Sequence, residues 1–462
     1  MSKNNTNSNK LNPWYKSVSS VRGPLIVVDK TKNVSYGEIC KIKTSDNREI
    51  FGQVLDCAHD KVIVQVFESS MGLDLAAKVQ FTSKPAQIGV TEDMLGQVFD
   101  GLGRSKGKKI IAKKHLDVNG SAINPAARRR PNNFIQTGIS TIDCMTTLVR
   151  GQKLPIFSSS GLPHNEVAAQ IVRQASVGDD EFVVIFAGMG ITNDQAAFFL
   201  EDFKKTGAMK RTIAFLNLAS DPSVERIITP RVALTTAEYF AYELNKHVLV
   251  ILTDFTNYCE SLREISSARS EVPGRRGYPG YMYTDLAMNY ERAGMVDGSS
   301  GSITQVPILT MPSGDKTHPV PDLTGYITEG QVVLDQDLHR KGIYPPINPL
   351  PSLSRLMGLG VGDGKTREDH KSVADQLYAA YAQGLELREL VSVVGESSLN
   401  KIDRLYLKFA NDFEDKFIRQ DHYEQRSIEE TLNLSWKLFS VFPKAELKKI
   451  KRDLVDKYLK KD

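Results

Sequence analysis

The spacing of apolar residues divides this chain of 462 residues into three sections. From about Val18 to Val90, apolar and polar residues alternate in short runs such as Pro24–Asp29, Glu49–Leu55 and Lys61–Phe67, separated by turns rich in Asp, Asn and Gly. Alternation with a period of two is typical of half-buried strands. The first section is therefore predicted to be a small β-barrel.

The second section, from about Thr91 to Met357, alternates short apolar runs with helical patterns. This order is typical of βαβ units, so it predicts an α/β domain with a mostly parallel sheet. The predicted strands are Leu154–Phe157, Phe182–Ala187, Thr212–Asn217, His247–Thr253, Ile303–Thr310 and Gln331–Leu334.

The third section, from Thr366 to Asp462, is predicted to be a bundle of helices. Apolar residues recur there at steps of three and four, as on the buried face of a helix. Ser427 and Glu430 have the spacing of a capping box, which marks the start of a helix. The residues of the two apolar faces are Ile402, Leu405, Phe409, Phe413 and Phe417, and then Leu447, Ile450, Leu454 and Tyr458.

These patterns predict four segments. Residues 1–13 form a disordered tail, residues 14–90 the barrel, residues 91–365 the α/β domain and residues 366–462 the helical domain. The tail is rich in Asn, Ser and Lys and has no apolar stretch, so we do not interpret it as a signal peptide.

The composition is that of a soluble globular protein, with 41% apolar and 25% charged residues and no tract of transmembrane length. The four cysteines have neither metal-site nor disulfide spacing, so we expect no metal site and a reducing cytoplasm. The net charge is only +4, and the basic runs lack interleaved aromatic residues. We therefore expect no nucleic acid partner.

The most informative segment runs from Leu154 to Glu166, between a predicted strand and a helix. A phosphate-binding loop belongs at this place, and a working one reads G-x-x-x-x-G-K-[ST]. The four positions that define the loop hold Ser158, Pro163, His164 and Asn165 instead.

Each replacement removes a group that would hold a phosphate. Pro163 has no N–H to donate, and His164 is shorter than Lys and mostly neutral near pH 7. Glu166 places a carboxylate in the first helical turn, where it would repel a phosphate. The backbone around Ser158, Ser159, Ser160 and Gly161 still offers donors, and with His164 and Asn165 these residues form a degenerate nucleotide site whose affinity we expect to be weak or absent.

Two further positions bear on hydrolysis. Asp254 ends an apolar strand, where a Mg²⁺-binding carboxylate would stand, although strands often end in Asp for capping reasons. The turn after Phe182–Ala187 offers Ile191 and Thr192 where a water-orienting carboxylate is needed, and Asp194 is expected to cap the next helix. The chain therefore lacks two requirements for hydrolysis: residues that bind the phosphates and a base that orients the water.

The run Leu359–Thr366 superficially resembles a phosphate-binding loop, but no apolar strand leads into it, and Leu359 stands where Gly is required. We interpret it as a flexible linker. Just before it, Arg355 follows the Pro-rich segment Tyr344–Leu353. From local sequence a surface ion pair is the better interpretation, but the position also suits an arginine finger that reaches a neighbour's triphosphate.

Five motifs taken together resemble the B subunit of rotary V-type or A-type ATPases, of the bacterial or archaeal form. The resemblance runs in order from about Val18 to Leu459. The motifs are Gln136–Asp143, Arg150–Phe157, Ser160–His164, Pro273–Tyr281 and Pro351–Leu356.

The resemblance implies an N-terminal β-barrel, a RecA-like nucleotide domain and a C-terminal helical domain. It also implies a non-catalytic subunit that alternates with three catalytic A subunits in a hexameric ring around a rotor. Arg355 falls on the family's arginine finger, and Tyr281, Tyr326 and Ser354 are expected to line the same interface.

In this interpretation ATP and Mg²⁺ are held mainly by the A subunit, and the chain has no intrinsic cofactor. Its other partners are the central rotor stalk and the peripheral stalk, and it contacts the membrane only indirectly, on the cytoplasmic side. The ring would couple ATP hydrolysis, or ATP synthesis, to the transport of H⁺ or Na⁺. No hydrolysis is expected from the chain alone; the alternative is a purely structural scaffold.

Overall fold

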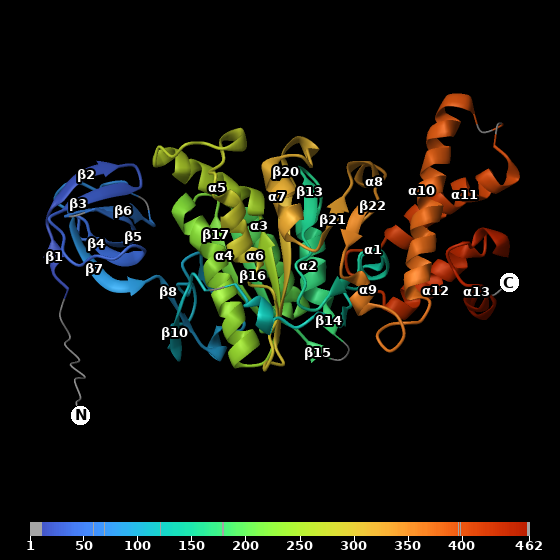
Figure 1. The fold of residues 1–462 in the computed structure, drawn as a ribbon, viewed down its shortest axis with the longest axis horizontal. Helices are drawn as coiled ribbons and strands as arrows, with labels where there is room; N and C mark the ends of the chain where they lie inside the picture. The colour runs from blue at the N-terminus through green and yellow to red at the C-terminus, as the bar shows by residue number, and fades with distance from the viewer. Residues whose placement is uncertain are drawn as a thin grey trace.

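The computed structural model describes residues 12–58, 60–68, 70–120, 122–177, 180–395, 397 and 399–459. Figure 1 shows three parts side by side in chain order: a curled sheet, a central α/β body and a group of helices. The predicted multidomain α/β architecture is therefore confirmed. Most of the tail predicted for residues 1–13 lies outside the described residues, and the limits of the other segments stay a prediction.

The first part is a seven-stranded antiparallel sheet with the strand order β1-β7-β4-β5-β6-β3-β2. Alternate residues of its strands, such as Ile26 and Val28, point into one apolar core, as the alternating pattern predicted. The strands are β1 (Trp14–Tyr15), β2 (Val18–Arg22), β3 (Leu25–Asp29), β4 (Glu38–Lys43), β5 (Glu49–Ala58), β6 (Lys61–Val66) and β7 (Lys78–Pro85).

The central part is built on a nine-stranded sheet with the order β22-β21-β13-β20-β18-β16-β17-β9, and β19 pairs with β20. All six predicted strands are present. The strands of this sheet are β9 (Val98–Asp100), β13 (Ile156–Ser159), β16 (Val183–Ile191), β17 (Thr212–Leu218), β18 (His247–Thr253), β19 (Gly294–Met295), β20 (Ser302–Met311), β21 (Gly330–Leu334) and β22 (Ile347–Ser354). Short two-stranded pairs join β8 (Gln87–Val90) to β10 (Lys114–Asp117), β11 (Phe134–Ile135) to β12 (Leu148–Val149), and β14 (Ser176–Val177) to β15 (Asp180–Glu181).

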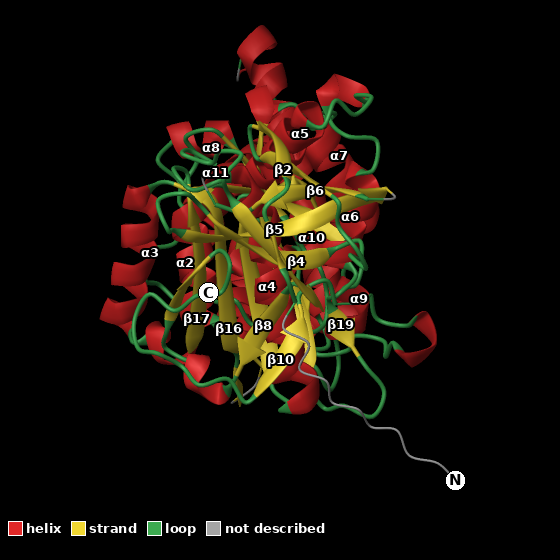
Figure 2. Cartoon of the chain, turned by 90° about the vertical axis from the view of Figure 1, so that its left-hand side faces the viewer, coloured by secondary structure: helices red, strands yellow, loops and turns green. Residues whose placement is uncertain are grey.

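Apolar side chains cover both faces of the central sheet. Along β18, Val250 belongs to one apolar core and the next residue, Ile251, to another, because successive side chains of a strand point to opposite faces. Figure 2 shows the strands standing between helices, with α3 on one flank and α6 and α7 on the other. The helices of this part are α1 (Ser140–Met145), α2 (His164–Gln174), α3 (Asn193–Thr206), α4 (Ser223–Glu238), α5 (Phe255–Ala268), α6 (Met282–Tyr290), α7 (Pro319–Ile327), α8 (Gln336–Arg340) and α9 (Met357–Gly360).

Strand β22 was not predicted, and it lies within the Pro-rich segment that precedes Arg355. Pro349 and Pro351 have no N–H to donate, which argues against a central strand. The strand is tolerated because it forms the edge of the sheet and pairs only with β21, antiparallel and with an irregular register. This edge strand carries Arg355 at its end.

The third part is helical, as predicted. Its helices are α10 (His370–Val394), α11 (Lys401–Asp412), α12 (Ile428–Phe439) and α13 (Arg452–Tyr458), with a π-helical turn at Phe413–Ile418. Phe409, Phe413 and Phe417 are fully buried. The capping box at the start of α12 is confirmed, since Ser427 and Glu430 bond reciprocally to each other's backbone N–H.

The run Leu359–Thr366, which we interpreted as a flexible linker, begins in the last residues of α9 and continues as a hydrogen-bonded turn. Thr366 Oγ1 accepts a hydrogen bond from Gly362 N at 2.9 Å, and Lys365 Nζ donates to Leu359 O at 2.7 Å. The Lys365 ammonium is therefore turned back onto its own segment.

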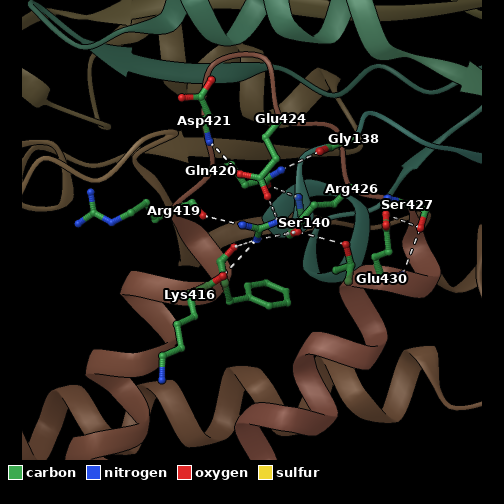
Figure 3. Close-up of polar contacts among 12 residues, drawn as sticks. Gly138, Ser140, Lys416, Arg419, Gln420, Asp421, Glu424, Arg426, Ser427 and Glu430 are labelled. Atoms are coloured by element: carbon green, nitrogen blue, oxygen red, sulfur yellow. Dashed lines mark hydrogen bonds and ion pairs between the residues drawn. The ribbon is translucent and has the colours of Figure 1, made fainter.

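The central and helical parts are joined by a polar network around Arg426, which we call the interdomain joint (Figure 3). The Arg426 guanidinium donates to the carbonyls of Phe417 at 3.0 Å and Arg419 at 2.9 Å, and pairs with the Glu424 carboxylate at 2.6 Å. Gln420 crosses to the central part, where it accepts from Ser140 N at 2.7 Å and donates to Gly138 O at 2.9 Å. The joint connects the helical part directly to the start of α1.

Within the described ranges, no helix is both long enough and apolar enough to cross a membrane.

Candidate functional site

The degenerate loop connects β13 to α2 at the carboxyl edge of the parallel strands, where ligands bind in open α/β sheets. Ser158 is fully buried, Ser159 is half-buried, and Ser160 and Gly161 are exposed. Gly161 has a φ of +84°, a conformation that side chains rarely adopt, and it turns the chain into the helix. The outline of a phosphate-binding loop is therefore preserved.

The side chain of His164 is folded back into the loop. Its Nδ1 lies 3.1 Å from Leu162 O and 3.2 Å from Ser158 Oγ. A carbonyl oxygen only accepts, so Nδ1 carries the proton, and the Ser158 hydroxyl is left to donate to Ser159 O at 3.2 Å. The two polar side chains nearest the expected phosphate position thus bond to their own loop.

The remaining loop residues do not supply the missing donors. Pro163 is the residue before the first turn of α2, and no side chain caps this helix. Asn165 Oδ1 is buried without a partner among the described residues, and the donor of this side chain is an uncharged amide Nδ2, which does not replace a Lys ammonium. Glu166 is the acid in the first helical turn. The residues present do not fit a Mg²⁺-bound triphosphate.

Both carboxylate oxygens of Asp254 accept hydrogen bonds from within the chain. Its carboxylate caps α5 by accepting from Thr256 N at 2.6 Å, and it accepts from the Thr310 hydroxyl at 2.5 Å. The side chain is 7% exposed. The capping role accounts for an acid at this position without a metal ion.

The turn after β16 contains no base. Ile191 is buried, and Thr192 caps α3 through a capping box with Gln195. Our expectation that Asp194 caps this helix was wrong, because Asp194 lies in the first turn and the cap is two residues earlier. A Thr followed three residues later by Gln was the sequence signal for this cap.

Arg355 lies in the turn that follows β22, and its side chain is exposed. Its backbone N–H donates to Glu329 O at 2.9 Å, and its Nη1 donates to Thr328 O at 3.1 Å. None of the ion pairs in the described part of the chain involves Arg355. A guanidinium has five N–H donors, so most of its binding capacity points away from the chain.

The loop lies at the carboxyl ends of the parallel strands, whereas Arg355 lies level with the amino end of β21. Ser354 pairs with Gly330, the first residue of β21, and β21 runs parallel to β13. The end of β13 is therefore about five residues further along, or about 16 Å at the rise of a strand. Arg355 cannot serve the loop of its own chain.

The three other predicted interface residues lie in different environments. Tyr326 is 73% exposed at the end of α7, two residues before Thr328, to which Arg355 bonds. Ser354 is buried, and its hydroxyl donates to Thr147 O at 2.8 Å.

Tyr281 lies away from Arg355, at the other end of a helix pair. The Tyr278 ring contacts the His318 ring before α7 begins, whereas the Tyr290 hydroxyl contacts Thr324 near the end of α7. Helices α6 and α7 are therefore parallel, and Tyr281 stands at their start. Burial and the nearby Glu271 carboxylate raise the pKa of Tyr281 to about 12.

Two residues around Arg355 were missed as functional candidates. Gln152 and Lys153 are almost completely buried beneath the turn that carries it. Both belong to the motif Arg150–Phe157, which we noted without assigning it a role. Two adjacent polar residues just before a buried strand were the available signal, since polar groups are rarely buried without specific partners.

Among the described residues, no group of three or more His, Cys, Asp or Glu side chains gathers in a way that could hold a metal ion.

Three family models match the chain, one for each part. The β-barrel domain of the ATP synthase alpha/beta family matches residues 18–83, and the nucleotide-binding domain of that family matches residues 138–354. The C-terminal domain of V and A type ATP synthase matches residues 359–459.

The chain is also similar to a solved structure, that of an ATP synthase subunit, NeqB, from Nanoarcheaum equitans. The two are 44% identical, the match covers 90% of this chain and 98% of that one, and the TM-score is 0.73. The chain therefore belongs to the ATP synthase alpha/beta family and carries the C-terminal domain of its V and A types.

Proposed function

We propose that this chain is the non-catalytic B subunit of a rotary V-type or A-type ATPase, and that Arg355 is an arginine finger supplied to a neighbouring subunit. One observation carries the proposal: the loop of the chain bonds to itself, while an exposed guanidinium lies level with the amino end of β21, far from the loop at the carboxyl ends of the strands. A cation at that place can serve only a site on another chain.

The partners follow from this role. Three such chains would alternate with three catalytic A subunits in a hexameric ring, with ATP and Mg²⁺ held mainly by the A subunits. Exposed Tyr326 lies beside Arg355 and would face the same neighbour. The ring would surround a central rotor stalk and be held by a peripheral stalk, at the cytoplasmic face of the membrane.

The chemistry asked of Arg355 is electrostatic. Charge spreads over the oxygens of the transferred phosphoryl group in the transition state, and a guanidinium in place stabilises that charge. Its planar fork of donors matches phosphate geometry, so Lys would not replace it fully. Closure of the interface would bring Arg355 onto the γ-phosphate, and the helical part would pass the resulting movement to the rotor.

The ring would thereby couple ATP hydrolysis or synthesis to the transport of H⁺ or Na⁺ by the membrane sector. The degenerate loop would bind nucleotide weakly or not at all. The second candidate function is a ring scaffold that contributes no chemical group. The two differ in whether removal of the Arg355 side chain changes turnover by the ring.

The test is steady-state ATP hydrolysis by this chain alone, by a cognate A subunit with this chain, and by the same ring with Arg355→Ala. We expect no turnover by the chain alone, turnover by the ring, and a loss of about 10³-fold or more in kcat for the variant. Turnover by the chain alone would refute the non-catalytic role. An unchanged kcat in the variant ring would favour the scaffold.

A further inference from the structure

The segment Arg150–Lys153 precedes β13 and carries two buried polar side chains beneath the Arg355 turn. We propose that Gln152 and Lys153 are positioning residues for Arg355: Gln152 fixes the turn, and Lys153 keeps the Glu329 carboxylate away from the guanidinium. The proposal rests on the function proposed for Arg355 and adds to it how the chain presents that group.

Gln152 joins three backbone segments through one amide. Its Oε1 accepts from Val149 N at 2.9 Å, which fixes the orientation of the amide. Its Nε2 then donates to Ser354 Oγ at 2.9 Å and to Glu329 O at 3.2 Å. The side chain is fully buried, so its bonds are shielded from water.

Both acceptors of Gln152 Nε2 adjoin Arg355. Ser354 is the preceding residue, and its hydroxyl donates in turn to Thr147 O at 2.8 Å. Glu329 O also accepts the backbone N–H of Arg355 at 2.9 Å. Gln152 therefore holds the residue before Arg355 and the carbonyl that fixes the Arg355 backbone.

Lys153 holds the Glu329 side chain. Its Nζ lies 2.6 Å from Glu329 Oε1, and its backbone N–H donates to Oε2 at 2.9 Å, so residue 153 binds both carboxylate oxygens. The Lys153 side chain is 3% exposed and also pairs with Glu291 at 3.1 Å. An ammonium buried this deeply needs such partners, and the pairing fixes its position.

The position of Glu329 makes this pairing relevant to Arg355. Arg355 bonds to the backbone of Thr328 and Glu329, so the Glu329 carboxylate belongs to a residue in direct contact with it. A carboxylate and a guanidinium form strong bidentate pairs, and such a pair would use the donors that a phosphate needs. Because Lys153 binds the carboxylate, the guanidinium stays available.

The experiment uses the assembled ring with a cognate A subunit and compares Gln152→Glu, Lys153→Met and Lys153→Met/Glu329→Gln. Glu at position 152 has the same shape and still accepts from Val149 N, but it cannot donate to Ser354. We expect kcat to fall about 10- to 100-fold with KM for ATP unchanged, since small misplacements of a charged group cost this much. Thermal unfolding of each variant chain checks that it folds.

The two Lys153 variants separate electrostatics from packing. Lys153→Met is expected to lower kcat about tenfold, because Glu329 Oε1 loses its ammonium partner and can pair with Arg355, while the backbone N–H of residue 153 still binds Oε2. Adding Glu329→Gln removes that carboxylate and is expected to restore kcat to within about threefold of the parent ring. A merely structural role for Lys153 predicts that the double variant is at least as impaired as the single one, and that result would overturn the proposal for Lys153.

The matched control is Gln170→Ala. Gln170 is also a buried glutamine that joins two segments, through Tyr344 and Glu424, but it contacts nothing near Arg355. We expect its kcat to stay within about twofold of the parent ring. If Gln152→Glu behaves like this control, the proposal for Gln152 is wrong.

Arg355→Ala serves as the background that distinguishes the proposed function of Arg355 from the positioning role of Gln152. In that background Gln152→Glu should cause no further loss of kcat, because the residue it positions is absent. If Arg355→Ala itself leaves kcat unchanged, the proposed function fails. If Arg355→Ala lowers kcat but Gln152→Glu does not, only the positioning role fails.

Discussion

The degenerate loop lies at the carboxyl ends of the parallel strands, and the Arg355 turn lies level with the amino end of β21. Both are held by internal hydrogen bonds, but these bonds orient their polar groups differently. In the loop, Ser158 and His164 bond to each other and to loop carbonyls, so the polar groups face inward. In the turn, Ser354 and Gln152 take up the internal bonds, and the Arg355 guanidinium is left to face outward.

Under the proposed function, this nucleotide-binding fold has lost its own site and contributes to the site of a neighbour. The sheet and α2 keep their places although the phosphate-binding residues are gone, because apolar packing on both faces determines the sheet. Strand β22 pairs only with β21 in the described sheet, so fewer of its backbone groups are needed for pairing and its sequence can vary more.

Gly330→Ala should displace the Arg355 turn. A Cβ at Gly330 would lie 2.0 Å from Leu353 O, and φ is +133°. We expect kcat of the ring to fall about 100-fold, because the end of β22 must move. Gly358→Ala is the control, since a Cβ there meets nothing within 4 Å. Equal kcat values for the two variants would show that the turn does not need this close contact.

Arg426→Ala should weaken the interdomain joint, which connects the helical part to the central part that carries both the loop and the Arg355 turn. The variant leaves the carbonyls of Phe417 and Arg419 without their donor and removes the partner of Glu424. We expect a loss of about 3 kcal/mol in the free energy of unfolding, measured by urea denaturation of the chain. Lys416→Ala, which removes an exposed ammonium paired with Asp412, should cost less than about 0.5 kcal/mol. Similar losses for both would contradict this role.

His370, which connects α10 to α1, should make the stability of the chain sensitive to acid. Burial lowers the pKa of its imidazole to about 4, and its Nε2 donates to Cys144 O at 3.0 Å. The unfolded chain takes up the proton near pH 6.5, so stability is lost as the pH falls from 6.5 towards 4. The loss should reach about 2 kcal/mol at pH 5.

The measurement is the difference in unfolding free energy between the protein and His370→Gln at pH 7.5 and pH 5. Burial raises the pKa of Asp143 and of Glu225 to about 7, which acts in the opposite direction. Both groups are present in the two proteins, so their contributions cancel in the difference. A difference that does not shrink at pH 5 would show that the buried imidazole is not the cause.

The smallest effect is expected when the loop is repaired by Pro163→Gly, His164→Lys and Asn165→Thr together. The donor and the cation that return should raise the Mg-ATP affinity of the chain about tenfold in a calorimetric titration. Turnover should stay absent, because Asp254 remains bonded to Thr310 and Ile191 offers no base. Turnover by the repaired chain alone would show that the loop lacked nothing else for hydrolysis, and it would contradict this prediction.

Much of the fold could be predicted because the apolar pattern is strong. Strand β18 matches its predicted limits, and the other predicted core strands differ by a few residues at most. Strand β22 could not be predicted, because Pro349 and Pro351 argue against a strand unless its edge position is known. Position in a sheet is a tertiary property that local sequence does not contain.

The candidate site shows the same limit. The loss of one backbone N–H and of the Lys ammonium was visible in the residue types of Pro163 and His164. The bond between His164 and Ser158 was not, since it depends on a side-chain rotamer and a tautomer. The two acceptors of Gln152 Nε2 lie about 180 to 200 positions away in the chain, so its role emerged only when the fold brought them together.

The proposed role of Arg355 is to stabilise phosphoryl-transfer charge in a neighbour's site. The most direct test is binding of Mg-ADP, with and without aluminium fluoride as a transition-state analogue, to rings that contain the parent chain or Arg355→Ala. The account predicts that both rings bind Mg-ADP with similar affinity, and that only the parent ring gains a large further stabilisation from aluminium fluoride. An equal gain in both rings would contradict it.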